Sequence, residues 1–374
     1  MSNSKKNVVF VLPSLRRGGA ETQLIELVNG LDTSLYNKHL FTFQQDLDQL
    51  DKLDLDNIEF SNEVRQGKIG INSARKLADL ITKNKIDVVH CTLQVSLLIA
   101  LLAIYISGKR PKLVLALHTT KNRNKKQEFY ERYFYRWLMM LCDQIIFVCK
   151  NQMSFWSDKY SFLKGKSVVV YNGVDITRFN KIETEDFGKS LRVKEGIGAE
   201  DFVIANVAGF RPEKGHELML NSFARLIKGK KAYLLLAGDG PLRQKYEDLA
   251  KKLGCYEYVR FLGNVSDVRP VISASTISVI SSTAETFSMA MLESMAMGKV
   301  LAATNVGGTS EAVIHDKTGL IVPPDDVAGM TEAISKLISD ESYRTTLEKA
   351  AATLVKENFT KEKMILKTSE VLLS

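Results

Sequence analysis

The sequence is poor in the features that mark several protein classes. Its four cysteines have no metal-ligand or redox spacing, and a disulfide scaffold of this size would need a denser set. The longest apolar stretch, 93–106, is too short to span a bilayer. The apolar run near the N-terminus is soon broken by Pro13, which disfavours a signal peptide. These absences predict a cytoplasmic chain with no transmembrane segment.

Two motifs that would indicate other chemistry occur only in an unsuitable form. The segment "AGDGPL" contains a Gly-x-Gly, but Arg243 stands where a dinucleotide fingerprint has its third glycine, which disfavours a dehydrogenase. Asp46-Leu-Asp48 superficially matches an Asp-x-Asp metal motif. Apolar residues alternate with acids throughout this run, "DLDQLDKLDLD", so we predict a solvated amphipathic segment and no metal site.

In the rest of the chain, short apolar runs alternate with segments whose apolar residues recur at helical spacing. Nearly continuous hydrophobic runs of this length are typical of strands buried on both faces, as in a parallel sheet. They are "NVVFVLP", "DVVHC", "KLVLALH", "QIIFVC" and "SVVVYNG", and then "DFVIANVAGF", "AYLLLAGDG", "YVRFLGN", "ISVISS", "VLAATN" and "GLIVPP". With 374 residues, the chain is predicted to form two α/β domains in tandem, with a boundary at the Asn172-Gly173 turn signal. Ligands of such sheets bind beyond the carboxyl ends of the strands, so two facing domains predict an interdomain cleft.

Positive charge is concentrated in the first half of the chain. Residues 1–180 hold 26 basic and 17 acidic residues, a net charge of +9, while the remainder carries −1. Nine of the basic residues fall between Lys109 and Arg136. Within this window, "NRNKKQEFYERYFYRWLMML" interleaves cations with aromatic rings, a pattern that suits an anionic membrane surface. Two alternatives stay open: the aromatics form the buried face of a helix, or the stripe binds nucleic acid, although no nucleic-acid motif accompanies it.

The stretch "STAETFSMAMLESMAMG" contains two carboxylates, Glu285 and Glu293. Ser288 or Thr286 can cap a helix of good helix formers that Gly298 ends. If the helix starts near Glu285, the carboxylates lie about 12 Å apart. Glycosidase pairs need roughly 5 to 10 Å, so this spacing better suits an elongated ligand such as a nucleotide sugar than a hydrolytic pair. The alternative is an exposed helix with two unrelated acids.

Three elements have the composition of phosphate sites. "LPSLRRGGAE" follows a strand and opens a helix, with Gly18 and Gly19 at the junction. "VAGFRPEKGHE" supplies Arg211 and Lys214, whose cations can neutralise a diphosphate without a metal or form a surface pair. The start of the helix after Phe287 offers further free N–H groups.

Taken in order, these motifs resemble the retaining glycosyltransferases of family 4, which have the two-domain GT-B fold. The resemblance covers nearly the whole chain and includes His118 after a strand. Its motifs are "GGAE" at 18–21, "NGVD" at 172–175, "GFRPEKGHE" at 209–217, "AGDGP" at 237–241, "FLGNV" at 261–265, "ETFSMAMLESMAMG" at 285–298, "GGTSE" at 307–311 and "TGLIVPP" at 318–324. It implies two facing Rossmann-like domains, an acceptor-side domain of residues 1–173 and a nucleotide-sugar domain of residues 174–358, with 359–374 as a C-terminal helix that packs back on the first.

The resemblance assigns roles to the residues that match. Glu293 is expected to bind the ribose hydroxyls, and Glu285 to face the transferred sugar. Arg211 and Lys214 would stabilise the leaving diphosphate. The remaining donor-side positions are Gly18 and Gly19 beside the phosphates, Val265 against the base, and backbone groups of Phe287, Ser288 and Met289 along the sugar and phosphate.

His118 is expected to touch the donor sugar and to belong with Glu285, Arg211 and Lys214 in the catalytic set. A single histidine at a strand end is more often structural, and His90, which also follows a strand, is a rival for this role. One departure concerns Thr286-Phe287-Ser288, where family members often carry glycine, phenylalanine and glycine or proline. The identity of the sugar is therefore not carried over.

The resulting prediction is a retaining glycosyltransferase, cytoplasmic and peripherally bound to the inner face of the membrane. It would move a hexosyl or N-acetylhexosaminyl group from a nucleotide diphosphate sugar, with UDP favoured, to a glycan or polyprenyl-linked acceptor, without a metal or other cofactor. Lys121, Arg123, Lys125 and Lys126 are the predicted membrane contacts. The alternatives are a non-catalytic GT-B partner subunit, against which the intact Glu285, Glu293, Arg211 and Lys214 argue, and a nucleotide-sugar epimerase of the same architecture.

Overall fold

The computed structural model describes residues 5–119, 129–229 and 231–374, and the chain divides into two compact units. The first unit consists of Met1–Asn172 and Lys361–Ser374, and the second of Gly173–Thr360. The boundaries expected from the sequence, after 173 and before 359, differ from these by one and two residues. The predicted interdomain cleft stays a prediction.

The first unit is built on a seven-stranded parallel sheet with the strand order β3-β2-β1-β4-β5-β6-β7. The strands are β1 (Lys6–Leu12), β2 (Tyr36–Thr42), β3 (Ile58–Asn62), β4 (Val88–Thr92), β5 (Lys112–Leu117), β6 (Gln144–Phe147) and β7 (Ser167–Val169). The helices are α1 (Gly19–Gly30), α2 (Ile71–Lys83), α3 (Gln94–Ser107), α5 (Arg136–Met140), α6 (Lys150–Lys159) and α15 (Lys361–Leu373), with a π-helical turn at Glu131–Tyr135 and 3-10 turns at Leu50–Lys52 and Ser161–Leu163.

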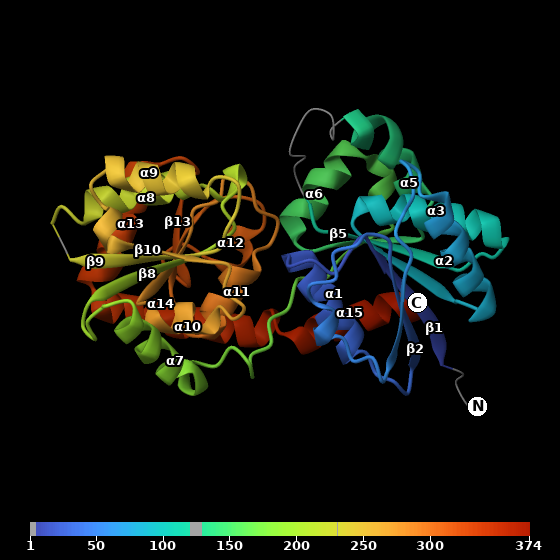
Figure 1. Ribbon diagram of the computed structural model, residues 1–374, viewed down its shortest axis with the longest axis horizontal. Helices are drawn as coiled ribbons and strands as arrows, with labels where there is room; N and C mark the ends of the chain where they lie inside the picture. The colour runs from blue at the N-terminus through green and yellow to red at the C-terminus, as the bar shows by residue number, and fades with distance from the viewer. Residues whose placement is uncertain (1–4, 120–128, 230) are drawn as a thin grey trace. The chain divides into compact units, whose positions relative to one another are not determined.

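Side chains on the two faces of this sheet form two separate apolar cores. One core joins alternate strand residues to α2, α3, α5 and α6, with Trp156 of α6 fully buried. The other joins the intervening strand residues to α1 and α15. Figure 1 shows α1 and α15 on one side of the sheet and α2 and α3 on the other. Because both faces are covered, the strands read as nearly continuous apolar runs in the sequence.

The second unit has a six-stranded parallel sheet with the order β10-β9-β8-β11-β12-β13. Its strands are β8 (Phe202–Val207), β9 (Ala232–Ala237), β10 (Val259–Gly263), β11 (Ile277–Ile280), β12 (Leu301–Thr304) and β13 (Gly319–Val322). Its helices are α7 (Lys181–Lys194), α8 (His216–Leu226), α9 (Arg243–Lys252), α10 (Arg269–Ala274), α11 (Met289–Ala296), α12 (Thr309–Ala312), α13 (Val327–Ser339) and α14 (Glu341–Asn358), with 3-10 turns at Pro212–Lys214 and Tyr256–Tyr258.

Both sheets reverse their strand order beside the first strand of the unit, as a doubly wound Rossmann-like sheet does. In the second unit, α8, α9 and α13 cover one face and α7 and α10 the other. The predicted fold class of two parallel-sheet α/β domains is therefore confirmed, and each of the eleven apolar runs contains a strand.

The last helix, α15, belongs to the first unit although the whole second unit precedes it. It packs beside α1, where Met364, Val371 and Leu372 enter the core of that face. Tyr36 Oη lies 2.7 Å from Ser369 Oγ, and Lys112 Nζ donates to the Val371 carbonyl at 2.6 Å. The C-terminal segment thus completes the sheet face that α1 begins.

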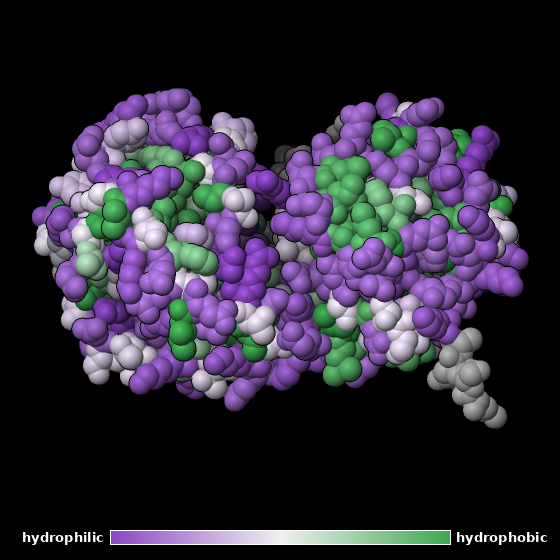
Figure 2. All heavy atoms as spheres, turned by 60° about the horizontal axis from the view of Figure 1, so that its bottom comes forward, coloured by the Kyte–Doolittle hydropathy of each residue, from purple (hydrophilic) through white to green (hydrophobic). Residues whose placement is uncertain are grey.

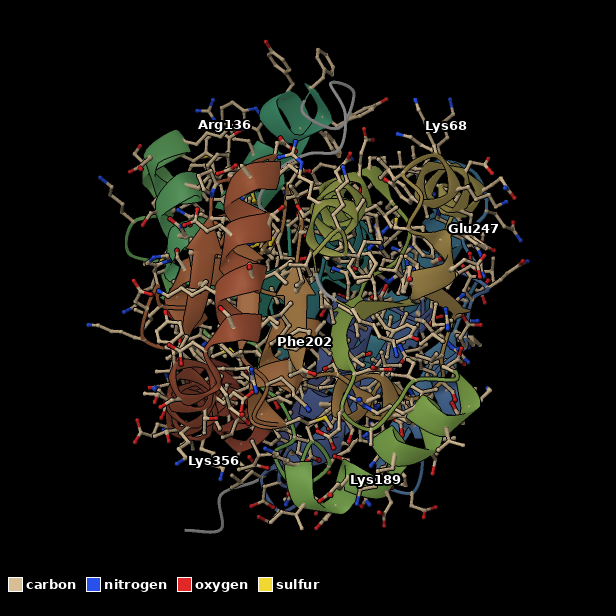
Figure 3. All side chains as sticks on the ribbon, turned by 90° about the vertical axis from the view of Figure 1, so that its left-hand side faces the viewer. Lys68, Arg136, Lys189, Phe202, Glu247 and Lys356 are labelled. Carbon is tan, nitrogen blue, oxygen red and sulfur yellow. The ribbon has the colours of Figure 1, made fainter. Side chains whose placement is uncertain are left out.

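On the face drawn in Figure 2, hydrophilic residues predominate and hydrophobic ones gather in a few patches. In the view of Figure 3, the exposed Lys189 of α7 and Lys356 of α14 lie at the periphery. Within the described residues, every helix is either too short or too polar to cross a bilayer.

Candidate functional site

The loops after β8 and β11 meet at the switch point of the second sheet. Sheets of this kind bind ligands outside the carboxyl ends of their strands at such a point. The β8 loop contains Arg211 and Lys214, and the β11 loop contains Glu285, so three of the predicted site residues come from these two loops.

A close backbone approach joins the two loops. Gly215 has a φ of +62°, and a Cβ atom at this position would lie 1.9 Å from the Ser281 carbonyl oxygen. Ser281 Oγ donates to the Lys214 carbonyl at 3.0 Å, and the Thr283 amide donates to the Glu213 carbonyl at 2.9 Å. The backbone of the β8 loop is therefore held directly against the backbone of the β11 loop.

This contact brings Lys214 and Glu285 together. Lys214 Nζ lies 2.5 Å from Glu285 Oε2, and both side chains are largely buried, with 17% and 15% exposed. Arg211 does not share this contact: its Nε pairs with Glu213 Oε1 at 3.4 Å, and its side chain is 42% exposed. The two predicted cations thus belong to two different ion pairs: Lys214 to a largely buried one and Arg211 to a more exposed one.

The loop after β12 supports Glu285 from another direction. A Cβ atom on Gly307, whose φ is +54°, would lie 1.9 Å from the Glu285 carbonyl oxygen. The Gly308 amide donates to the Thr286 carbonyl at 2.7 Å. Three carboxyl-edge loops therefore fix the backbone at residues 281–286.

Helix α11 starts later than the spacing argument assumed. Ser288 is its N-cap and accepts a hydrogen bond from the Met291 amide, and Gly298 follows the helix with a φ of +66°. Glu285 lies in the loop before the helix, so the separation of about 12 Å, which assumed a helix from Glu285, does not apply. Helix geometry leaves the first amides after Ser288 without an intrahelical acceptor, as an anion site requires.

Phe287 and Met289 flank the N-cap of α11. Phe287 is buried, with its ring 5.3 Å from that of Phe359, so its side chain belongs to the core of the unit. The role that the resemblance assigns to its backbone stays a prediction. Met289 is half-buried.

Glu293 lies on α11, where it is half-buried and feels the charges of Arg178 and Asp267. Burial raises its pKa from 4.5 to about 7; the positive charge of Arg178 lowers it in part, and the negative charge of Asp267 adds to the rise. Asp267 is itself held by Arg269, whose Nη2 lies 2.6 Å from Asp267 Oδ2. Near neutral pH Glu293 is therefore an acid poised between its protonated and ionised forms.

Replacing Glu293 with glutamine should stabilise the protein at high pH. The folded state binds the proton more tightly than the unfolded chain, so stability falls as pH rises from 4.5 through 7. We expect the variant to match wild type near pH 4 and to exceed it at pH 8 by at most roughly 3 kcal/mol. Urea unfolding at the two pH values measures this difference. An equal difference at both would contradict the assigned burial of the charge.

Val265 follows β10, the edge strand of the second sheet. It is half-buried and packs against the core formed with α7 and α10. Gly263, just before it, has a φ of +69° and lies beside the Arg243 guanidinium. The structure places Val265 at the same carboxyl edge as Lys214, Glu285 and the start of α11.

In the first unit, Gly18 and Gly19 lie where the sequence predicts, between β1 and α1. Gly18 is the N-cap of α1 and Gly19 its first residue. A Cβ atom on Gly18 would lie 2.3 Å from Oε2 of Glu21, a buried carboxylate that pairs with Arg16 at 3.1 Å. The exposed Gly19 leaves the start of the helix open to solvent.

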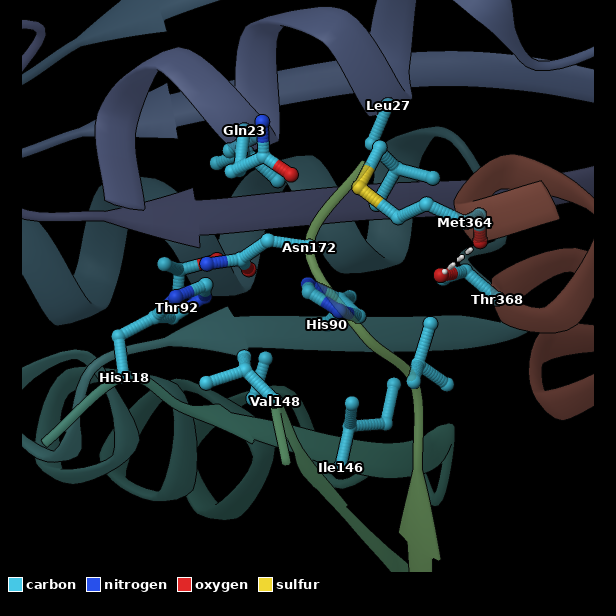
Figure 4. Close-up of a pocket in the computed structure, with 13 residues that line it drawn as sticks. Gln23, Leu27, His90, Thr92, His118, Ile146, Val148, Asn172, Met364 and Thr368 are labelled. Carbon is cyan, nitrogen blue, oxygen red and sulfur yellow. Dashed lines mark hydrogen bonds between the residues drawn. The ribbon is translucent and has the colours of Figure 1, made fainter. Parts of the chain in front are cut away.

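His118 directly follows β5 and lines a small hollow in the first unit (Figure 4). His90 does not follow a strand, contrary to expectation, but lies inside β4 and is 2% exposed. It lines the same hollow. Burial lowers the pKa of both imidazoles from 6.5 to about 4, so both are neutral at physiological pH.

The aromatic residues near α5 are not a buried helix face. Phe129, Tyr130, Tyr133, Phe134 and Trp137 are all exposed. Their exposure contradicts the buried alternative for these five rings and leaves a basic, aromatic surface. The four predicted membrane cations, Lys121, Arg123, Lys125 and Lys126, lie outside the described residues.

The acidic run 46–56 is solvated and amphipathic, as predicted. Asp46 and Asp48 are exposed, whereas Leu53 is buried. Across residues 5–119, 129–229 and 231–374, no group of three or more His, Cys, Asp or Glu side chains is arranged to hold a metal ion.

Three polar residues of the site were not predicted from the sequence. Glu213 pairs with Arg211, while Arg178 and Asp267 set the charge environment of Glu293. Glu213 is part of the motif "RPEKG", but the motif does not predict that Glu213 forms an ion pair with Arg211. Arg178 and Asp267 come from segments far from Glu293 in the sequence and carry no local signal.

Two family models cover most of the chain. The model for glycosyl transferases group 1 matches residues 188–354, and the model for Glycosyltransferase Family 4 matches residues 17–178. The chain belongs to the group 1 glycosyltransferases. The family that the motifs resemble is thereby confirmed. The group 1 match lies within the second unit, and the Family 4 match lies in the first unit except for residues 173–178.

Relatives of this glycosyltransferase include enzymes with different acceptors. It is 26% identical over 295 residues to N-acetyl-alpha-D-glucosaminyl L-malate synthase of Bacillus anthracis, covering 78% of this chain and 76% of that one. It is 34% identical over 165 residues to the lipopolysaccharide core biosynthesis glycosyltransferase LpsE of Rhizobium meliloti, covering 44% and 48%.

The fold matches that of several solved proteins, among them a glycosyltransferase from Rickettsia africae with a TM-score of 0.83 at 21% identity over 98% of each chain. Anabaena Alr3699/HepE, in complex with UDP and glucose, superposes with a TM-score of 0.86 at 21% identity, over 98% of this chain and 99% of that one. The glycosyltransferase therefore has the GT-B fold, with seven strands in one sheet and six in the other.

Proposed function

We propose that this glycosyltransferase transfers a hexosyl or N-acetylhexosaminyl group, with retention of configuration, from a UDP-sugar to a glycan or polyprenyl-linked acceptor. The observation that carries the proposal is the enclosed Lys214–Glu285 pair beside the start of α11, at the switch point of the second sheet. The UDP and glucose bound to the Anabaena protein support the donor class, and the lipopolysaccharide relative supports a cell-surface product.

In this proposal, positively charged groups bind the diphosphate, and Glu285 and the neutral His118 face the sugar. Lys214, Arg211 and the free amides of α11 stabilise the negative charge that grows on the departing diphosphate. Glu285, held against Lys214, faces the sugar, and His118 contacts the same sugar as a neutral hydrogen-bonding group. The departing diphosphate helps to deprotonate the acceptor hydroxyl, the front-face route that the family resemblance implies.

The nucleotide end is held by Glu293, Val265 and the glycine loop. Glu293 accepts hydrogen bonds from the ribose hydroxyls, Val265 lies against the base, and Gly18 and Gly19 lie beside the phosphates. Phe287, Ser288 and Met289 contribute backbone groups to the sugar and phosphate. A sugar hydroxyl can bind either form of Glu293, but the ionised form binds it more tightly, because charge-assisted hydrogen bonds are the stronger ones.

A panel of nucleotide sugars tests the function directly. We expect UDP-glucose, UDP-galactose or UDP-N-acetylglucosamine to raise the melting temperature and to be hydrolysed slowly without acceptor. With a polyprenyl-linked glycan, UDP should be released faster, because the sugar is then transferred to the acceptor hydroxyl. The Glu293→Ala variant should lose nucleotide affinity, measured by calorimetry. Stabilisation without any turnover would instead favour a non-catalytic partner subunit, and release of an epimerised nucleotide sugar would favour an epimerase.

Metal independence is a separate prediction. Because Lys214 and Arg211 supply positive charge for the leaving group, we expect full activity after exhaustive chelation with EDTA. The check is the initial rate before and after chelation. Loss of turnover that Mg²⁺ or Mn²⁺ restores would overturn this prediction and direct attention to Asp46 and Asp48.

We further propose that the enzyme acts in the cytoplasm at an anionic inner membrane leaflet. The first half of the chain carries +9, and the exposed rings of Phe129 and Trp137 lie within and directly after the basic window from Lys109 to Arg136. Each cation near such a surface contributes about 1 kcal/mol. Nucleic acid is not proposed as the partner, because no nucleic-acid motif accompanies this stripe in the sequence.

Vesicle co-sedimentation should show salt-sensitive binding to phosphatidylglycerol vesicles and little binding to phosphatidylcholine. Changing Lys121, Arg123, Lys125 and Lys126 to glutamate should abolish most of the binding. The same change at the exposed Lys189 and Lys356 of the second unit serves as the charge control. Equal pelleting with both lipids, or an equal effect of the two sets of changes, would contradict membrane binding through this surface.

A further inference from the structure

The hollow in the first unit is lined by uncharged residues alone. Its walls come from α1, β4, the ends of β5, β6 and β7, and α15 (Figure 4). The polar side chains among them are Gln23, His90, Thr92, His118, Asn172 and Thr368. Leucine, isoleucine, valine, alanine and methionine side chains form the rest.

Two of these side chains each have a buried polar atom without a hydrogen-bond partner. His90 Nδ1 and Thr92 Oγ1 have no hydrogen-bond partner among the described residues, although His90 is 2% and Thr92 1% exposed. A buried polar atom without a partner costs about 1 to 3 kcal/mol, so such atoms are normally satisfied by ordered water. Phe10 fixes one side of His90, with its ring 5.2 Å away.

The hollow has the size and polarity to hold water. Its volume of about 30 Å³ suffices for roughly two water molecules, since one needs about 10–15 Å³. A buried water requires two to four polar partners, and His90, Thr92 and His118 supply three. Both imidazoles are neutral, so each offers one donor and one acceptor nitrogen.

We propose that His90 and Thr92 hold ordered water that hydrogen-bonds to His118, which makes His90 a positioning residue for His118. The bond made by one nitrogen of an imidazole determines which nitrogen keeps the proton. Water held by His90 and Thr92 bonds to one nitrogen of His118, so it shifts the ratio of the two His118 tautomers and orients the nitrogen that His118 presents outward. The kinetic consequence rests on the proposed function, whereas the tautomer itself does not.

The test compares four variants with the wild type by NMR of protein labelled with ¹⁵N-histidine, and a fifth variant serves for signal assignment. The chain has five histidines, and His118→Phe assigns the signals of interest. His90→Phe removes the polar atom and keeps a ring against Phe10, and Thr92→Val removes the hydroxyl without a change of shape. His90→Asn retains a polar atom close to the position of Nδ1. His39→Phe is the control, because His39 is buried on β2 but bonds to Glu59 and Asn84 instead of lining the hollow.

We expect His90→Phe and Thr92→Val to change the tautomer ratio of His118, and His90→Asn and His39→Phe to leave it as in wild type. In donor hydrolysis, His90→Phe should raise KM about fivefold with little change in kcat, the loss of one hydrogen bond. An unchanged His118 signal in both His90→Phe and Thr92→Val would overturn the proposal, as would an equal change in His90→Asn. A wild-type enzyme without donor turnover would refute the proposed function and leave the NMR result to decide this inference.

Discussion

Replacing Gly215 with alanine should destabilise the second unit by roughly 3 to 5 kcal/mol and abolish sugar transfer. Two effects add at this position. A side chain with a φ of +62° is strained by about 1 kcal/mol or more, and its Cβ atom would lie 1.9 Å from the Ser281 carbonyl oxygen. Because that oxygen belongs to the backbone, neither loop can yield without moving Lys214 or Glu285.

Gly254 and Gly229 provide matched controls in the same unit. Gly254 has a φ of +70° with nothing within 4 Å of the added Cβ, so alanine there isolates the backbone strain. Gly229 has neither a left-handed φ nor a neighbour within 4 Å, so its alanine variant should be near neutral. Urea unfolding followed by circular dichroism gives the three free energies. A Gly215→Ala value within 1 kcal/mol of Gly254→Ala would show that the two loops are not locked together.

The second large effect is expected at the Lys214–Glu285 pair. Removing a preorganised group that stabilises transition-state charge commonly lowers kcat by about 10² to 10³. We expect losses of that size for Lys214→Met and for Glu285→Ala, and for Glu285→Ala turnover should fall more than donor affinity. The double variant should be little worse than either single variant, because each side chain orients the other at 2.5 Å.

Lys189 and Glu185 form the control pair for this experiment. They lie 2.8 Å apart on α7, and each is 65% exposed, so their replacement should change kcat little. Arg211→Met should cost less than Lys214→Met, because Arg211 is more exposed and already paired with Glu213. The initial rates of the five variants measure both expectations. Additive losses at Lys214 and Glu285 would contradict the proposed cooperation.

Most of the fold could be predicted from the sequence because both faces of each sheet are buried. Eleven strands appear in the sequence as short apolar runs, and a parallel sheet under two layers of helices leaves no polar face to interrupt them. β2 and β3 were missed. β2 contains Lys38, which is buried in the structure because its Nζ donates to the Val28 and Leu31 carbonyls at the end of α1. In the sequence, a lysine within an apolar run indicates an exposed position, because its hydrogen bonds to a neighbouring helix cannot be foreseen.

The sequence predicts which residues belong to the site, but it does not predict which of them contact one another. The motifs single out Lys214 and Glu285, yet only the close approaches at Gly215 and Gly307 reveal that the two charges touch. The raised pKa of Glu293 depends on Arg178 and Asp267, which come from separate segments. The hollow at His90 likewise depends on packing among α1, α15 and several strands, which no local pattern encodes.

The position of α15 also has a consequence for how the protein is made. A ribosome releases the first 172 residues long before the last helix exists, so the face of the sheet beside α1 lacks Met364, Val371 and Leu372 while the whole second unit is synthesised. Until then, nascent chains present an unfinished apolar face of the kind that recruits chaperones or aggregates. A premature stop codon at the start of α15 would therefore damage the first unit rather than the last one translated, and a C-terminal fusion would be attached to the element on which the completion of that unit depends.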